Sequence, residues 1–205
     1  VAAQAGRLFW RMREFTLDLE KISEKLANKS KDIKKEEWHA LQLEWLMKAG
    51  TLSHYWGDLA QPLHVTENHD GAMTGQKGIH SYFEDTMVNE LITGLAKRVF
   101  TDSAKLWPAF HKKHAKYTSD ELIHELAMDS KSHVDELLKI DKKNGRENKA
   151  KTALKFENLI VQRMTTGALF LAEIYTRNAK WEPNNERFFA FDASPAYVKA
   201  PAAKE

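Results

Sequence analysis

The residues best suited to do chemistry are histidines and carboxylates gathered in one short part of the chain. The stretch SHYWGDLAQPLHVTEN contains His54, Asp58 and His64. A second group, His80 and Glu84, follows shortly afterwards. These side chains offer nitrogen and oxygen ligands, which Zn²⁺ accepts when no sulfur is available. Because the chain has no cysteine, any metal site must be built from such ligands.

The spacing of these residues suggests how they would be arranged. His54 and Asp58 are four residues apart on a predicted helix, so they project from one face about a turn apart. His80 and Glu84 repeat this spacing at the start of the next predicted helix. His64 follows a helix-stopping proline between the two pairs, and a turn and loop there would let all five side chains converge. A single pair of this kind is usually a surface pair, so spacing alone leaves both interpretations open.

Helical periodicity is frequent along the chain, and alternating strand patterns are nearly absent. We therefore predict an all-α fold, a multi-helix bundle. The expected helices run from about Leu8 to Leu26, Trp38 to Asp58, Ile79 to Phe100, Ser103 to Ala115 with a kink or break at Pro108, Thr118 to Ile140, and Leu154 to Ile174.

Local signals support several of these boundaries. Pro62 disfavours helical geometry in Gln61 and so ends the second helix. Three glycines between Glu67 and Gly78 predict a loop. A capping box, T-x-x-E, opens the helix at Thr118.

Length and composition favour one globular domain. The 205 residues are 42% hydrophobic and 29% charged, and the net charge is only +2. This balance gives no reason to expect a nucleic-acid or membrane-surface partner, and no apolar run reaches the length of a membrane span. We predict an all-α domain over 1–180 and an irregular tail over 181–205, packed on it by Phe188, Phe189 and Phe191.

Two of these stretches resemble motifs of one enzyme superfamily. HYWGDLAQPLH, from His54 to His64, resembles the H-x-x-G-D-x-x-Q-P-[LM]-H signature of zinc-dependent phospholipase C, which the related single-strand-specific nucleases share. GIHSYFE resembles the family's second element, G-x-H-S-x-x-E. The nuclease branch usually ends this element with Asp, so Glu84 is closer to the phospholipase branch. QRMTTGALFLAEIY is similar to the family's C-terminal helix.

The resemblance implies an all-α fold with a cluster of up to three zinc ions. It implies that His64, His80 and Glu84 bind one zinc, while His54 and Asp58 bind a second, Asp58 bridging to a third. The implied catalytic residues are Asp58 and Glu84. The implied activity is hydrolysis of a phosphoric diester by a metal-activated water.

The implied substrate is a phospholipid, and the alternative is a single-strand nuclease or 3′-nucleotidase of the same superfamily. The resemblance also implies an extracellular or periplasmic location.

Four further metal ligands of the family have no counterpart here. They precede the signature, yet only 53 residues precede His54, Val1 is not the usual Trp, and no histidine occurs before His39. We expect either that a missing N-terminal segment or chain completes the site, or that this is a divergent member with a reduced site. A third hypothesis is that the chain is a catalytically incomplete zinc-binding fragment. The zinc held by three ligands is the one expected to be retained.

Other residues near the motifs are weaker candidates. Tyr55, His69 and Asp70 are candidates for substrate binding, with core packing or a solvated loop as the alternatives. Gly57 would serve helix packing or a close approach, and Gln61 would orient a ligand or cap the helix end. We expect the later histidines to lie on the surface: His111, His114, His124 and His133.

Overall fold

The computed structural model describes residues 7–28 and 33–178, and helices account for most of them. No strand occurs among these residues, which confirms the expected all-α class. The elements are α1 (Leu8–Ala27), α2 (Lys35–Ala60), η1 (Pro62–Val65), η2 (Ala72–Thr74), α3 (Ile79–Ser81), η3 (Tyr82–Met87), α4 (Val88–Glu90), α5 (Ile92–His114), α6 (Ser119–Ser132), α7 (Val134–Asn144) and α8 (Lys149–Asn178).

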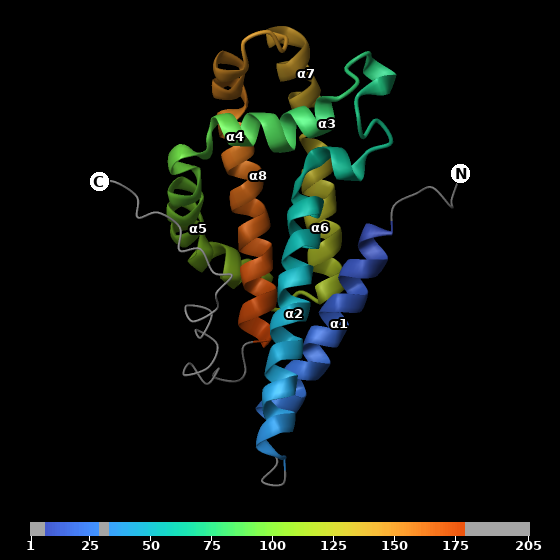
Figure 1. Cartoon of the computed structure of the whole chain (residues 1–205), viewed down its shortest axis with the longest axis vertical. Coiled ribbons are helices and arrows are strands. Elements are labelled where there is room, and N and C mark those ends of the chain that lie inside the picture. Colours follow the sequence, from blue (N-terminus) through green and yellow to red (C-terminus); the bar gives the residue numbers. More distant parts are fainter. Residues whose placement is uncertain (1–6, 29–32, 179–205) are drawn as a thin grey trace, which may run out of the picture.

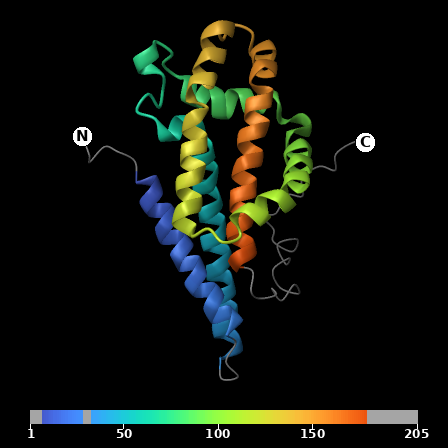
Figure 2. The same ribbon diagram turned by 180° about the vertical axis from the view of Figure 1, so that it is seen from behind.

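The long helices form an elongated bundle. Helices α1, α2, α6 and α8 run roughly along the long axis, and the segment from α3 to α4 crosses one end of the bundle (Figure 1). Helix α2 packs against α1, α6 and α8, so it is the central helix. Helix α5 flanks α8 on the side away from α1, as the view from behind also shows (Figure 2).

Two hydrophobic clusters hold the elements together. The first joins the long helices around Trp56, whose ring stacks on Phe170 of α8 with centroids 6.0 Å apart. The second lies under the crossing segment, where Phe83 meets Phe156 edge to face at 5.5 Å. The first cluster therefore shapes the bundle, and the second supports the end that carries the candidate ligands.

Two predicted helix boundaries are wrong. The helix expected from Ile79 to Phe100 ends at Glu90, where Leu91 leaves helical geometry, and a second break follows at Gly94, whose φ of +81° is left-handed. Helix α5 then runs to His114 with Pro108 inside it, and its ribbon changes direction along its length (Figure 2). The break expected before Ser103 does not occur.

The helix expected from Thr118 to Ile140 is also divided. The capping box is present, with Thr118 and Glu121 hydrogen-bonded to each other's backbone amides. However, α6 ends at Ser132, and α7 begins at Val134. The predicted tail, 181–205, with Phe188, Phe189 and Phe191, lies outside the described residues. Among the described helices, none has the length and apolar character needed to cross a bilayer.

Candidate metal centre

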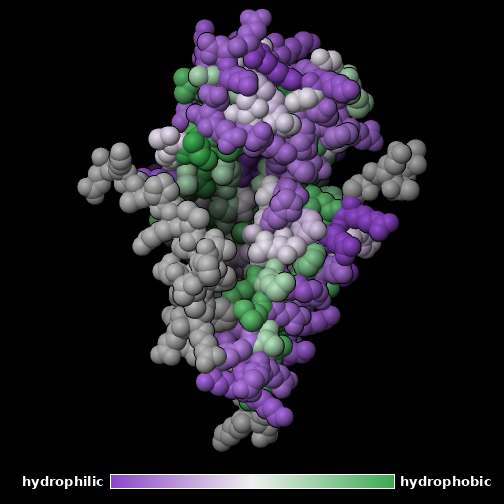
Figure 3. Space-filling view, in the orientation of Figure 1, coloured by the Kyte–Doolittle hydropathy of each residue, from purple (hydrophilic) through white to green (hydrophobic). Residues whose placement is uncertain are grey.

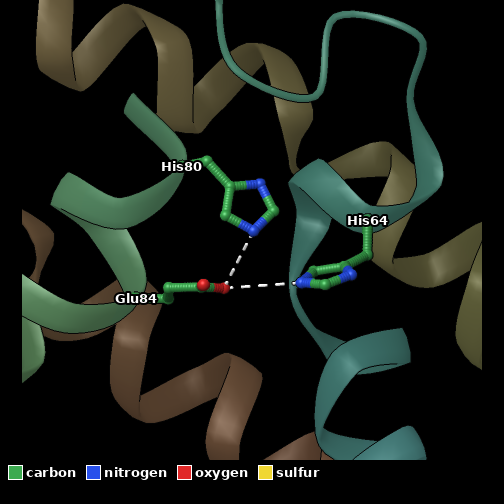
Figure 4. Close-up of side chains that lie close together, drawn as sticks. All are labelled: His64, His80 and Glu84. Carbon is green, nitrogen blue, oxygen red and sulfur yellow. Dashed lines mark hydrogen bonds and ion pairs between the residues drawn. The ribbon is translucent and has the colours of Figure 1, made fainter. Parts of the chain in front are cut away.

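Three of the five predicted ligands come together at the end of the bundle. Glu84 Oε2 lies 3.4 Å from His64 Nε2 and 3.2 Å from His80 Nε2. One ligand atom from each residue lies within 4.8 Å of the other two, and the three side chains point toward a common point (Figure 4). The two imidazole rings are 4.7 Å apart between centroids. This group could hold a metal ion.

The spacing of these atoms suits tetrahedral zinc. Ligand atoms at about 2.0–2.1 Å from a tetrahedral Zn²⁺ are separated by about 3.3–3.4 Å from one another. The two measured distances to Glu84 Oε2, 3.4 and 3.2 Å, match that separation. The side chains of His64 and His80 are 26% and 23% exposed, so solvent reaches the group. Two imidazoles and one carboxylate would leave a fourth position open.

Each ligand follows a buried apolar residue that anchors its backbone. Leu63, Ile79 and Phe83 directly precede the three ligands, and all three side chains are buried in the second hydrophobic cluster. Glu84 also lies in η3, a π-helical segment, and such segments are frequent at functional sites. The ligands are therefore carried by a rigid base, while their own side chains reach the surface.

The loop before α3 orients His80. The Nδ1 atom of His80 lies 3.0 Å from the backbone carbonyl oxygen of His69. A carbonyl oxygen only accepts, so Nδ1 carries a proton, and Nε2 is the ring nitrogen left to face Glu84 and to bind an ion. Asp70 accepts from the His80 amide at 3.4 Å. A hydrogen bond from the Gly78 amide, followed by that from His80, lowers the pKa of the Asp70 carboxyl below its ordinary value.

Gln61 makes two side-chain contacts that bear on the roles left open for it. Its Oε1 accepts from the Leu63 amide and so caps the turn after α2. Its Nε2 donates to Glu84 Oε2 at 3.0 Å. One side chain therefore connects the end of α2 to the carboxylate of the ligand group.

The other predicted pair stays apart from this group. His54 Nε2 and Asp58 Oδ2 are 3.4 Å from each other, as helical spacing predicts. His54 is 72% exposed and Asp58 is 24% exposed. Neither belongs to the group of three that could hold an ion, as far as the described residues show. Two ligands alone leave a second metal position incomplete.

An apolar cavity of about 430 Å³ lies beside the ligand group. Its walls come from α2, the crossing segment, α5 and α8, and Asp58, Gln61 and Glu84 line part of it. Most other lining residues are apolar: Trp56, Phe83, Val88, Val99, Ile160, Met164 and Leu171. Figure 3 shows hydrophobic residues around a hollow in this part of the surface. The cavity connects the Asp58 carboxylate with Glu84, although the two belong to separate pairs.

Arg163 is a cavity residue that the motifs did not single out. Its guanidinium is buried and donates to the Ala60 carbonyl at 3.1 Å, to Asp129 at 2.6 Å and to Ser130 at 3.3 Å. It therefore holds the C-terminal end of α2 next to Gln61. The sequence could have drawn attention to Arg163, because it is a charged residue on the apolar face of α8, between Ile160 and Gly167.

The structure also gives the contacts of the weaker candidates. The ring of Tyr55 packs on Phe15 of α1 at 5.6 Å and is not among the residues that line the cavity. A Cβ atom at Gly57 would meet no other atom within 4 Å, so this glycine is not needed for packing and instead lines the cavity. His69 and Asp70 contact His80 through a carbonyl and a carboxylate.

The expectation that the later histidines lie on the surface is wrong for His114. It is buried and hydrogen-bonds to the Phe110 carbonyl and to Glu125. His111 lies 2.7 Å from the carboxylate of Glu173, which is fully buried. These contacts arise where the end of α5 packs against α6 and α8, which helical faces alone do not show.

Comparisons with models of protein families, with curated proteins and with solved structures found no match for this chain.

Proposed function

We propose that this chain is a zinc-dependent phosphodiester hydrolase that resembles phospholipase C. One observation carries the proposal: His64, His80 and Glu84 converge, and Glu84 also lines an apolar cavity that a second acidic residue, Asp58, lines as well. A metal beside such a cavity suits a substrate with a charged phosphate and an apolar portion.

The residues of this chain would have separate roles in binding the ion and the substrate. His64, His80 and Glu84 would hold the zinc, and Gln61 would orient the carboxylate. When bound, zinc would neutralise phosphate charge and lower the pKa of a water molecule. Asp58 would lie on the substrate side, where its carboxylate could accept a proton or, with His54, bind a further ion.

The cavity favours a lipid-like substrate over a nucleic acid. Its lining is mostly aliphatic, and the ring of its largest aromatic residue, Trp56, is fully buried against Phe170. Binding of single strands commonly uses exposed aromatic platforms and a basic groove. Among the lining residues the only basic side chain is Arg163, which is occupied by α2 and α6. A single-strand nuclease is therefore the second candidate.

Zinc binding is tested first. We expect purified protein, prepared without chelator, to bind one zinc tightly by elemental analysis and calorimetric titration. The double variant His64→Ala with His80→Ala should lose it. His39→Ala is the matched control, because His39 lies fifteen residues before His54 on α2, about 22 Å along the helix. Equal zinc content in all three proteins would refute the site.

Hydrolysis is tested separately, with zinc present. Phosphatidylcholine vesicles, a chromogenic phosphodiester and single-stranded DNA distinguish the two enzyme candidates. Glu84→Gln should abolish any turnover, while its exposed neighbour Asp85→Asn, the control, should retain it. Zinc binding without turnover of any substrate would support the incomplete fragment and exclude independent activity of this chain.

A further inference from the structure

A buried ion pair lies behind the loop that precedes the ligand His80. Asp141, near the end of α7, is buried, and it accepts from Arg146 at 2.8 Å (Nε to Oδ1) and 2.9 Å (Nη2 to Oδ2). Arg146 stands in the short connection between α7 and α8. Its guanidinium also lies over the ring of Tyr82 in η3, 5.1 Å from the centroid. The pair thus joins the α7–α8 connection to the segment that carries Glu84.

The same arginine holds the loop backbone. Arg146 donates to the carbonyl oxygens of Gln76 at 2.8 Å and Lys77 at 2.9 Å, so all three of its nitrogens are engaged. Gln76 in turn donates to the Leu138 carbonyl and to Asp141, both at 2.8 Å. Figure 1 shows this loop at the same end of the molecule as α7. Two consecutive loop residues, Gln76 and Lys77, are therefore tied to α7 and to the connection after it.

The loop has two halves: residues 76–78, where Arg146 binds, and residues 69–71, where His80 is contacted. The first half supports the second. A Cβ atom at Gly71 would lie 2.5 Å from the Gln76 carbonyl oxygen, so the two halves are in close contact there. The Gln76 amide donates to the Gly71 carbonyl at 2.8 Å, and the Gly78 amide donates to the Asp70 carbonyl at 3.1 Å. Positions 69–71 therefore follow any movement of positions 76–78.

We propose that Arg146 is a positioning residue for the metal centre, which holds the loop so that the His69 carbonyl presents His80 to the ion. This inference rests on the proposed zinc site. Without the hydrogen bonds of Arg146 the loop would move, and the His69 carbonyl, 3.0 Å from Nδ1, would no longer fix the Nδ1 proton of His80. The Nε2 lone pair would then point toward the ion for less of the time.

The contacts argue for a geometric role rather than a charge effect. Asp141 compensates the charge of Arg146, and hydrogen bonds to Asp141 are the main cause that raises the pKa of the arginine. What the guanidinium adds is a rigid fork that reaches one carboxylate and two carbonyls at once. Lysine at the same position would restore the charge without the fork.

The test compares Arg146→Gln, Arg146→Lys and the control Arg98→Gln. Arg98 also bridges two segments, with bonds to Glu157 and Asn158 on α8, but it does not contact the loop. We expect Arg146→Gln to weaken zinc binding by about tenfold, the lower end of the effect of losing a direct partner of a metal ligand, because Arg146 acts on His80 through the loop backbone. Arg146→Lys should recover only part of this loss, and Arg98→Gln should bind zinc like the unchanged protein.

Two measurements on metal-free protein separate positioning from general destabilisation. Hydrogen exchange of the Gly78 and Ile79 amides should accelerate by about tenfold or more in Arg146→Gln. Proton and nitrogen NMR at pH 8 should show the Nδ1 proton of His80, which faces the His69 carbonyl, exchanging with water faster in Arg146→Gln than in the unchanged protein, while the ring nitrogens of His64 stay unchanged. A merely structural role would leave the exchange of this Nδ1 proton as it is.

The outcomes are distinct. Unchanged zinc affinity in Arg146→Gln, or equal losses in Arg146→Gln and Arg98→Gln, would overturn the inference. Full recovery by lysine would overturn the claim that the fork matters. If the unchanged protein binds no zinc, the proposed function fails, whereas exchange of the loop amides and of the His80 Nδ1 proton still decides whether Arg146 positions the loop.

Discussion

Helices α2 and α8 approach closely at Gly167, and replacing this glycine by alanine measures how tightly they pack. A Cβ atom at position 167 would lie 2.9 Å from the Cβ of Ala60. That is about 0.5–1 Å inside the usual contact distance of two carbon atoms. Overpacking of this kind costs about 1–3 kcal/mol, whereas alanine in a helix gains about 0.5–1 kcal/mol over glycine. We expect Gly167→Ala to lower the free energy of unfolding by about 1 kcal/mol net.

Gly50 provides the matched control. It lies in α2, is exposed, and a Cβ atom there would meet no other atom within 4 Å. Gly50→Ala should therefore raise the free energy of unfolding by about 0.5–1 kcal/mol through helix propensity alone. Urea unfolding followed by circular dichroism gives both values, as shifts of the midpoint at constant slope. The difference between the two variants isolates the overpacking cost, about 1–3 kcal/mol.

Equal stabilisation of the two variants would refute the close approach of α2 and α8. The same experiment bears on the cavity, because Gly167, Ala60 and Gln61 all line it. If alanine at 167 pushes α2 outward, Gln61 moves away from Glu84 and zinc binding weakens. An unchanged zinc affinity in a clearly destabilised Gly167→Ala would show that the strain is relieved elsewhere.

Three further outcomes are expected. Zinc at a hundred times its dissociation constant should stabilise the folded protein by about 2.7 kcal/mol, so chelation should lower Tm by about 5–11 °C in a scanning experiment. Gln61→Ala should remove the hydrogen bond that caps the Leu63 amide and so lower the free energy of unfolding by about 1 kcal/mol in urea. It should also weaken zinc binding by about tenfold or more in titration calorimetry, because Gln61 donates to Glu84. Normal zinc binding would contradict this link to Glu84. Burial alone would raise the pKa of Glu125, but hydrogen bonds from Lys113 and His114 outweigh it and lower that pKa. The folded state therefore binds fewer protons than the unfolded state, so this stabilisation is present above the unfolded pKa of about 4.3 and is lost as pH falls through the lower folded value. Between pH 7 and pH 3, the free energy of unfolding measured in urea should fall more steeply for the unchanged protein than for Glu125→Gln. Parallel curves would contradict the lowered pKa of Glu125.

The ligand group combines local and distant support. Buried residues directly before each ligand fix the backbone, and side chains from the end of α2 and from the loop before α3 orient the ligand atoms. Arg163 and Arg146 then tie these two supports to α6, α7 and α8. Changes far from the ion along the sequence are therefore expected to alter its affinity.

Local signals in the sequence determined much of the fold. Apolar periodicity located the long helices, and Pro62 ended α2 where predicted, because proline constrains the residue before it. The capping box at Thr118 is present for the same local reason. The four-residue spacing of His54 with Asp58 and of His80 with Glu84 placed each pair on one helical face. All of these depend on neighbouring residues along the chain.

The tertiary structure decided which of these groups meet. Periodicity did not reveal the breaks at Gly94 and His133, because the apolar pattern continues across both positions and an isolated glycine is tolerated within many helices. Packing against other elements decides where the axis turns. Spacing also could not tell that His64 joins His80 and Glu84 while His54 and Asp58 remain a separate pair. That separation depends on how the loop between α2 and α3 folds, and contacts with Asp141 and Arg146, distant in the sequence, hold that loop. Sequence therefore supplied the ligand pairs, and long-range packing assembled one of them with a third residue.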